Sequence, residues 1–121
     1  MAKKKSEAGS LKKVVLDAIL DKKGKELVAL DLRKIKITPA DFFIITHGDS
    51  STQVRAIFDN VVKEAKEKGF TPYHTEGSGN SEWIIVDFAD VVVHIFLRDK
   101  RDFYALEELW SDAKLTKYGE S

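Results

Sequence analysis

The sequence predicts an α/β domain in which a single mixed β-sheet is flanked by helices. Helical and strand-like segments follow one another in the order α-β-β-α-β-β-β-α. The two strongest strand segments are separated by only two residues, which predicts an antiparallel hairpin. The helix between two earlier strands predicts a crossover connection. We expect one domain over residues 10–113, between a mobile basic tail over 1–9 and a C-terminal tail over 114–121.

The first third of the chain contains one helix and two strands. Ser10 is a suitable N-cap, and Gly24 is a plausible stop for the helix that follows. This helix has apolar residues at helical spacing, namely Leu11, Val14, Val15, Ala18 and Ile19. Residues 27–32 read as a strand, and residues 41–46 as another. The second strand is apolar on both faces at its centre, so we expect it to be covered on both sides.

The most distinct helix of the sequence starts after Ser50. Ser50 and Gln53 have the spacing of a capping box, and Gly69 is suited to end the helix. Its apolar stripe consists of Val54, Ile57, Phe58, Val61, Val62 and Ala65. Residues 72–75 form a weak strand, followed by a flexible Gly-rich loop over 77–80.

The hairpin and the closing helix occupy the last third. The hairpin strands span residues 83–88 and 91–97. A final helix is expected from about Asp102 to Ala113, with one stripe formed by Phe103, Leu106, Leu109 and Trp110. Tyr104 lies about 100° from Phe103 on the helical wheel, so it points outward or to the edge if that stripe faces the core.

Composition excludes several classes of function. Lys+Arg and Asp+Glu are both 20, and this zero net charge argues against a protein that grips nucleic acid through many phosphates. The chain has no cysteine, which excludes disulfides, thiolate metal sites and cysteine catalysis. No apolar run approaches the roughly 20 residues of a membrane helix. We therefore expect a cytoplasmic protein without a membrane partner.

Three aspartates provide the strongest enzyme-like pattern. Asp41, Asp87 and Asp90, near the turn at Gly48, are reminiscent of the carboxylates that hold Mg²⁺ in nucleotidyltransferases. Each has a structural explanation as well, because aspartates at strand ends and in tight turns hydrogen-bond to nearby backbone amides. We favour the structural explanation and expect no catalytic, cofactor-binding or metal-binding residues. A Mg²⁺-dependent nucleotidyltransferase-like enzyme is the alternative.

The three histidines give weaker signals. His94 alternates with apolar residues in a strand, so we interpret it as a hydrogen-bonded structural histidine. His47 precedes a glycine in a turn at a helix N-terminus, where a phosphate could bind. His74 stands in an expected edge strand and indicates no particular function. No Ser/His/Asp order or zinc-binding histidine pair is persuasive.

Several strings resemble those of the Iojap-like ribosomal silencing factors, and of the bacterial members most closely. They lie at residues 40–46, 48–54, 77–94 and 104–110, in the family's order and spacing. The resemblance covers about residues 10–112 and implies a nucleotidyltransferase-like fold without known transfer activity. It also implies a protein that binds large-subunit ribosomal protein fourteen. Such proteins sterically block the association of the two ribosomal subunits and repress translation when nutrients are scarce.

The resemblance also places the docking surface. In the family, the residues matching Trp83 and Tyr104 belong to that surface, so we expect these two to be the main anchors. Phe103, Leu106 and Glu107 are expected to shape or border it, although Phe103 and Leu106 are equally well explained as core residues. A homodimer of the free protein through the same patch is an alternative. We interpret the lysines of the basic end as solvated and non-specific, with a weak attraction to ribosomal RNA as a secondary alternative; they are Lys3, Lys4, Lys5, Lys12 and Lys13.

Overall fold

The computed structural model describes residues 2–35, 40–104 and 112–119, apart from the side chains of 2–8 and 102–104. Helices and strands follow one another along the chain, with three helices and six strands in the described part. They are α1 (Ala2–Asp21), β1 (Lys25–Asp31), β2 (Phe42–Gly48), α2 (Ser51–Glu67), β3 (His74–Glu76), β4 (Trp83–Asp87), β5 (Val91–Leu97), α3 (Arg98–Tyr104) and β6 (Lys114–Lys117).

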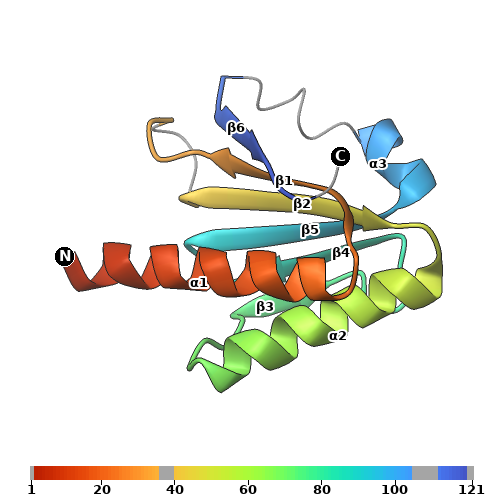
Figure 1. Ribbon diagram of the computed structural model, residues 1–121, viewed down its shortest axis with the longest axis horizontal. Coiled ribbons are helices and arrows are strands. Elements are labelled where there is room, and N and C mark those ends of the chain that lie inside the picture. Colours follow the sequence, from red (N-terminus) through yellow and green to blue (C-terminus); the bar gives the residue numbers. More distant parts are fainter. Residues whose placement is uncertain (1, 36–39, 105–111, 120–121) are drawn as a thin grey trace.

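All described strands form one mixed sheet in the order β3-β4-β5-β2-β1-β6 (Figure 1). The central pair β2 and β5 is parallel, and every other pair is antiparallel. The expected hairpin is β4–β5, and the expected crossover joins β2 to β5 by way of α2 and the β3–β4 segment. The α/β fold class predicted from the sequence is therefore confirmed.

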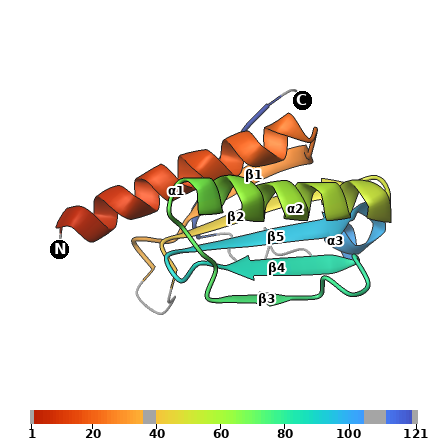
Figure 2. The same cartoon turned by 90° about the horizontal axis from the view of Figure 1, so that it is seen from below.

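Helices α1 and α2 lie side by side on one face of the sheet (Figure 2). The side chains between them and the sheet form the main core, which includes Val15, Ile19, Ile44, Ile57, Val61, Ile84, Val93 and Ile95, each fully buried. Asn60 of α2 is also buried here, and its Nδ2 donates to the carbonyl oxygen of Ala18 in α1 at 2.9 Å. This bond satisfies a polar group that would otherwise be costly inside the core.

The start of α2 confirms the expected capping residues. The backbone N–H of Gln53 donates to Ser50 Oγ at 3.1 Å, and Gln53 Oε1 accepts from the N–H of Asp49. The amide of Gln53 also donates to the carbonyl oxygen of Lys23, which ties α2 to the turn after α1. The bond to Ser50 satisfies one orphan donor of the first turn, and the three bonds together fix where α2 begins.

The opposite face of the sheet, here called the second face, carries a smaller apolar cluster. Its buried members are Val28, Leu30, Leu32, Ile45 and Phe96, and Ile35, Phe43, Trp83 and Ala113 pack against them with partial exposure. Helix α3 follows β5 directly and contacts this face through Arg101. The second face thus combines apolar and polar side chains.

The ends of the chain differ from the sequence expectation. Helix α1 begins at Ala2 rather than after Ser10, because residues 2–9 include lysine, alanine and glutamate, which favour helix. Helix α3 begins at Arg98 rather than Asp102, and Asp112 and Ala113 lie in a turn rather than in a helix. Within the expected C-terminal tail, residues 114–117 form β6, because β1 offers them an unpaired edge.

Candidate functional site

Trp83, the first expected anchor, begins β4 and is held in place by the preceding loop. Gly77 has φ +84°, and a Cβ at this position would lie 2.0 Å from the carbonyl oxygen of Trp83. Only glycine allows this close approach of two backbone segments. On the other side, the N–H of Leu97 donates to the carbonyl oxygen of Glu82 at 2.8 Å. The backbone of Trp83 is therefore fixed by the loop and by the hairpin.

The Trp83 side chain belongs to an aromatic cluster on the second face. Its ring stacks on Phe96 with centroids 5.0 Å apart, and its Nε1–H donates to Nδ1 of His94 at 3.2 Å. Phe43 meets the His94 ring edge to face at 4.8 Å. Trp83 is half-buried, whereas His94 and Phe96 are buried. The cluster positions an indole at the border between core and surface.

A second buried histidine lies where α3 meets the sheet. Nη1 of Arg101 in α3 lies 3.1 Å from Nδ1 of His47 and 3.3 Å from the carbonyl oxygen of Lys25. Because a guanidinium only donates, His47 Nδ1 accepts. Burial and the charge of Arg101 lower the pKa of His47, so the ring is neutral at pH 7. A register irregularity after Lys25, with Glu26 at φ 43°, lies next to the carbonyl that Arg101 reaches.

Trp83 and His47 lie in the same row across the sheet. The strand register pairs Trp83 with Phe96, Phe96 with His47, and His47 with Lys25. Neighbouring strands are about 4.8 Å apart, so Trp83 and the anchor of α3 are separated by about 10 Å on one face. The row therefore brings the start of β4 and the helix that ends at Tyr104 to one end of the second face.

The other expected docking residues are placed only in part. Tyr104 and Phe103 lie in the last turn of α3, but their side chains are outside the described residues. Leu106 and Glu107 lie wholly outside the described residues. Arg101 is not predicted by the sequence, because its charge and its position between Lys100 and Asp102 give no sign of burial. Its partners are distant in the chain, so no local pattern could have identified it.

The three aspartates of the enzyme alternative take part in backbone hydrogen bonds at the ends of strands. Asp87 Oδ1 accepts from the N–H of Ala89 at 2.7 Å, which supports the left-handed backbone of Ala89 in the hairpin loop. The backbone oxygen of Asp90 accepts from the N–H groups of Asp41 and Phe42. Within the described part of the chain, no three acidic or histidine side chains are grouped so that they could hold a metal ion. The observed contacts of Asp87 agree with a turn-stabilising role.

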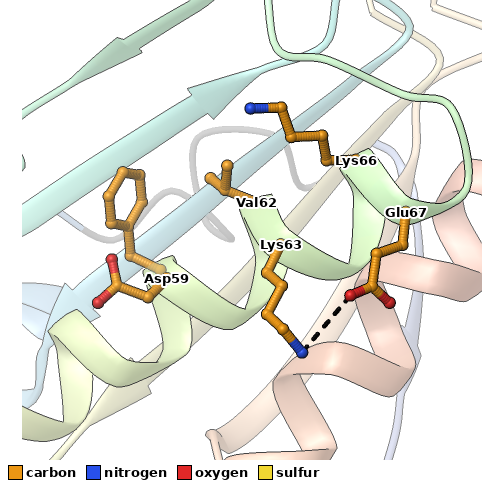
Figure 3. A pocket seen from close by; sticks show the side chains of 6 residues that line it. Asp59, Val62, Lys63, Lys66 and Glu67 are labelled. Atoms are coloured by element: carbon orange, nitrogen blue, oxygen red, sulfur yellow. Dashed lines mark ion pairs between the residues drawn. The ribbon is translucent and has the colours of Figure 1, made fainter.

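Helix α2 carries an open hollow on its surface. It is lined by Phe58, Asp59, Val62, Lys63, Lys66 and Glu67 (Figure 3). Lys63 pairs with Glu67 at 3.6 Å in a solvent-exposed ion pair. These side chains belong to successive turns of one helix, and their charges face solvent. The hollow offers neither a convergent set of polar groups nor an enclosed surface for a substrate.

Comparison with known proteins identifies the family. The family described as "Ribosomal silencing factor during starvation" matches residues 4–120. The chain belongs to this family of ribosomal silencing factors. It is 43% identical over 103 residues to the ribosomal silencing factor of Halalkalibacterium halodurans, covering 85% of this chain and 87% of the relative.

A solved structure and a more distant relative extend the comparison. The crystal structure of a Chromobacterium violaceum protein matches with a TM-score of 0.82 and 35% identity, covering 93% of this chain and 92% of that one. A mouse protein named for mitochondrial assembly of the ribosomal large subunit is 33% identical over 90 residues, which are 69% of this chain and 40% of the mouse protein. None of the described helices of this ribosomal silencing factor is long and apolar enough to cross a membrane.

Proposed function

We propose that this ribosomal silencing factor binds large-subunit ribosomal protein fourteen and blocks the small subunit from joining. The observation that supports this most is the row that brings Trp83 and the anchor of α3 together on the second face. A half-buried tryptophan with a fixed backbone is the type of residue that dominates the binding energy of protein interfaces. In the family that the chain resembles, the residues matching Trp83 and Tyr104 belong to the docking surface, which supports the same assignment.

The proposed mechanism involves no chemical step. The domain docks through Trp83 and Tyr104, with Phe103, Leu106 and Glu107 at the border of the patch, and its bulk occupies space that the small subunit needs. The name of the mouse relative, which refers to the ribosomal large subunit, supports the choice of that subunit as the partner. The engagement of Asp87 in the hairpin loop supports a non-catalytic protein.

Co-sedimentation with purified large subunits tests this proposal. We expect Trp83→Ala and Tyr104→Ala each to weaken binding by about 30-fold or more, the scale of an interface hot spot. Tyr73→Ala is the matched control, because Tyr73 is 80% exposed and its N–H bonds to Asp87 at the other end of β4. Unchanged binding of the Trp83→Ala/Tyr104→Ala double variant would refute the docking surface.

Light scattering of mixed subunits tests the blocking step separately. We expect the wild-type chain to reduce reassociation of the two subunits, and the Trp83→Ala variant to leave it unchanged. Binding to the large subunit without any effect on reassociation would contradict the steric mechanism while preserving the docking site.

The remaining proposals concern the free protein. We propose that it works in the cytoplasm, and that a homodimer through the same patch competes with docking. A mass that falls on dilution in light scattering, together with replacement of the homodimer by a one-to-one complex when the partner is added, would support this competition. A weak contact between the basic end and ribosomal RNA would appear as a salt-dependent loss of affinity in a variant of Lys12 and Lys13.

A further inference from the structure

The indole of Trp83 is held on the second face by two different kinds of contact. Phe96 lies directly opposite Trp83 in the β4–β5 register and stacks on its ring at 5.0 Å. His94, two residues earlier on the same face of β5, accepts a hydrogen bond from Trp83 Nε1 at 3.2 Å. Stacking restricts the plane of the indole, and the hydrogen bond selects which way its N–H edge points. The two contacts together leave one orientation.

The hydrogen bond also determines where the proton of His94 lies. An indole nitrogen only donates, so Nδ1 of His94 accepts and the proton of the neutral ring is on Nε2. This Nε2 is buried and, within the described residues, has no hydrogen-bond partner. The neighbouring rings of Phe43, Trp83 and Phe96 carry no charge, and burial lowers the pKa of His94 to about 4.

A purely structural role would not favour histidine at this position. A buried N–H group without an acceptor destabilises the fold, whereas phenylalanine would fill a similar volume without any polar atom. Among the described residues, the side-chain hydrogen bond that histidine gains in exchange is the one to Trp83. Histidine therefore lowers the stability of the fold while fixing the orientation of the half-buried Trp83 side chain.

We propose that His94 is a positioning residue that preorients Trp83 for docking on the ribosomal partner. The inference rests on the proposed docking function of Trp83 and specifies how that anchor is prepared. An indole that is already fixed before binding loses less side-chain freedom on docking. Loss of the acceptor is therefore expected to weaken binding by about two- to tenfold, a smaller effect than loss of Trp83 itself.

The first test measures the hydrogen bond in the free protein with His94 and Trp83 unchanged. In the ¹⁵N-labelled chain with Trp110→Phe, only one indole remains, and its Nε1–H should show a through-bond coupling to His94 Nδ1 and slow hydrogen exchange. Absence of the coupling at neutral pH, together with fast exchange, would overturn the proposal. This measurement does not involve the ribosome, so it is independent of whether the proposed docking function is correct.

The second test compares two substitutions of His94 by co-sedimentation. His94→Phe keeps a ring but removes the acceptor, and we expect two- to tenfold weaker binding. His94→Asn places an amide oxygen at the same distance from Cβ as Nδ1, and we expect it to retain the bond and most of the affinity. Equal losses in both variants would contradict a role for the acceptor.

A double-mutant cycle separates positioning from general destabilisation. In a Trp83→Phe background the donor is absent, so His94→Phe should have no further effect on binding. If His94→Phe weakens binding equally in both backgrounds, His94 acts on the fold and the proposal fails. If Trp83→Ala itself leaves binding unchanged, the docking function fails instead, while the coupling measurement still decides whether His94 orients the indole.

Discussion

The two faces of the sheet differ in how their side chains are used. The face under α1 and α2 is packed with fully buried aliphatic residues, and its buried Asn60 is hydrogen-bonded to the carbonyl oxygen of Ala18. The second face contains a smaller apolar cluster, a half-buried tryptophan and two buried histidines. One of these histidines contains a buried nitrogen without a hydrogen-bond partner among the described residues.

This difference indicates that the residues that stabilise the fold and the residues expected to bind a partner lie on opposite faces of the sheet. Apolar packing is non-directional and stabilises the fold in proportion to the buried area. Hydrogen bonds to buried rings add little net stability but define orientation. The helix-covered face is therefore expected to determine the free energy of unfolding, and the second face to determine docking.

The largest expected effect on stability concerns the helix-covered face. Ile57 is fully buried between α2 and the sheet, so Ile57→Ala should reduce the free energy of unfolding by about 4 kcal/mol. Urea denaturation measures this change. The matched control is Ile85→Ala, because Ile85 is half-buried on the second face of β4. A larger loss for Ile85→Ala than for Ile57→Ala would contradict the comparison.

The second prediction concerns pH and the second face. Burial in the folded protein lowers the pKa of His94 from 6.5 to about 4. Between pH 6.5 and 4, the His94 ring is therefore protonated in the unfolded chain but neutral in the folded protein. Stability should therefore fall as the pH decreases from 6.5 to 4, by about 3 kcal/mol from this residue. The pKa of His47 is also lowered, which acts in the same direction.

Urea denaturation of wild type and His94→Phe at several pH values measures this contribution. The variant should lack the part of the pH dependence that belongs to His94, so wild type should lose about 3 kcal/mol relative to His94→Phe between pH 6.5 and 4, and the two stability curves should separate as the pH decreases. Parallel curves over the whole range would show that His94 does not titrate as inferred.

The third prediction concerns the loop that carries Trp83. Gly77→Ala forces alanine into a left-handed backbone with φ +84° and brings its Cβ against the carbonyl of Trp83. We expect a loss of about 2 kcal/mol in stability and weaker docking per folded molecule. Gly79→Ala is the control, because a Cβ there would meet nothing within 4 Å. An effect of similar size in both variants would show that the contact with Trp83 is not the cause.

Elements with strong local signals could be predicted from the sequence. The α2 helix was predicted because Ser50 and Gln53 mark its start and an apolar stripe follows at helical spacing. The β4–β5 hairpin was predicted from two apolar segments and a short connection. Strand β6 was missed because Lys114, Leu115, Thr116 and Lys117 are all exposed, and only pairing with β1 makes them a strand.

Individual residues of the candidate site could be predicted from the sequence, but the contacts between them could not. Trp83 was expected as an anchor and His94 as a hydrogen-bonded structural histidine, but their mutual bond depends on the exact register of the hairpin. The contact between His47 and Arg101 spans 54 positions and depends on how α3 folds back onto the sheet. Leu97 directly precedes Arg98 and is not a capping residue type, so the start of α3 has no capping signal either.

The smallest expected effect concerns the cap of α2, on the helix-covered side. Ser50→Ala removes the acceptor of the Gln53 N–H and should reduce the free energy of unfolding by about 1 kcal/mol. Ser51→Ala is the matched control, since Ser51 is exposed and already inside the first turn. Because α2 lies on the face opposite Trp83, docking per folded molecule should be equal for both variants. A selective loss of docking in Ser50→Ala would show that the two faces are coupled through β2, whose end leads directly into this cap.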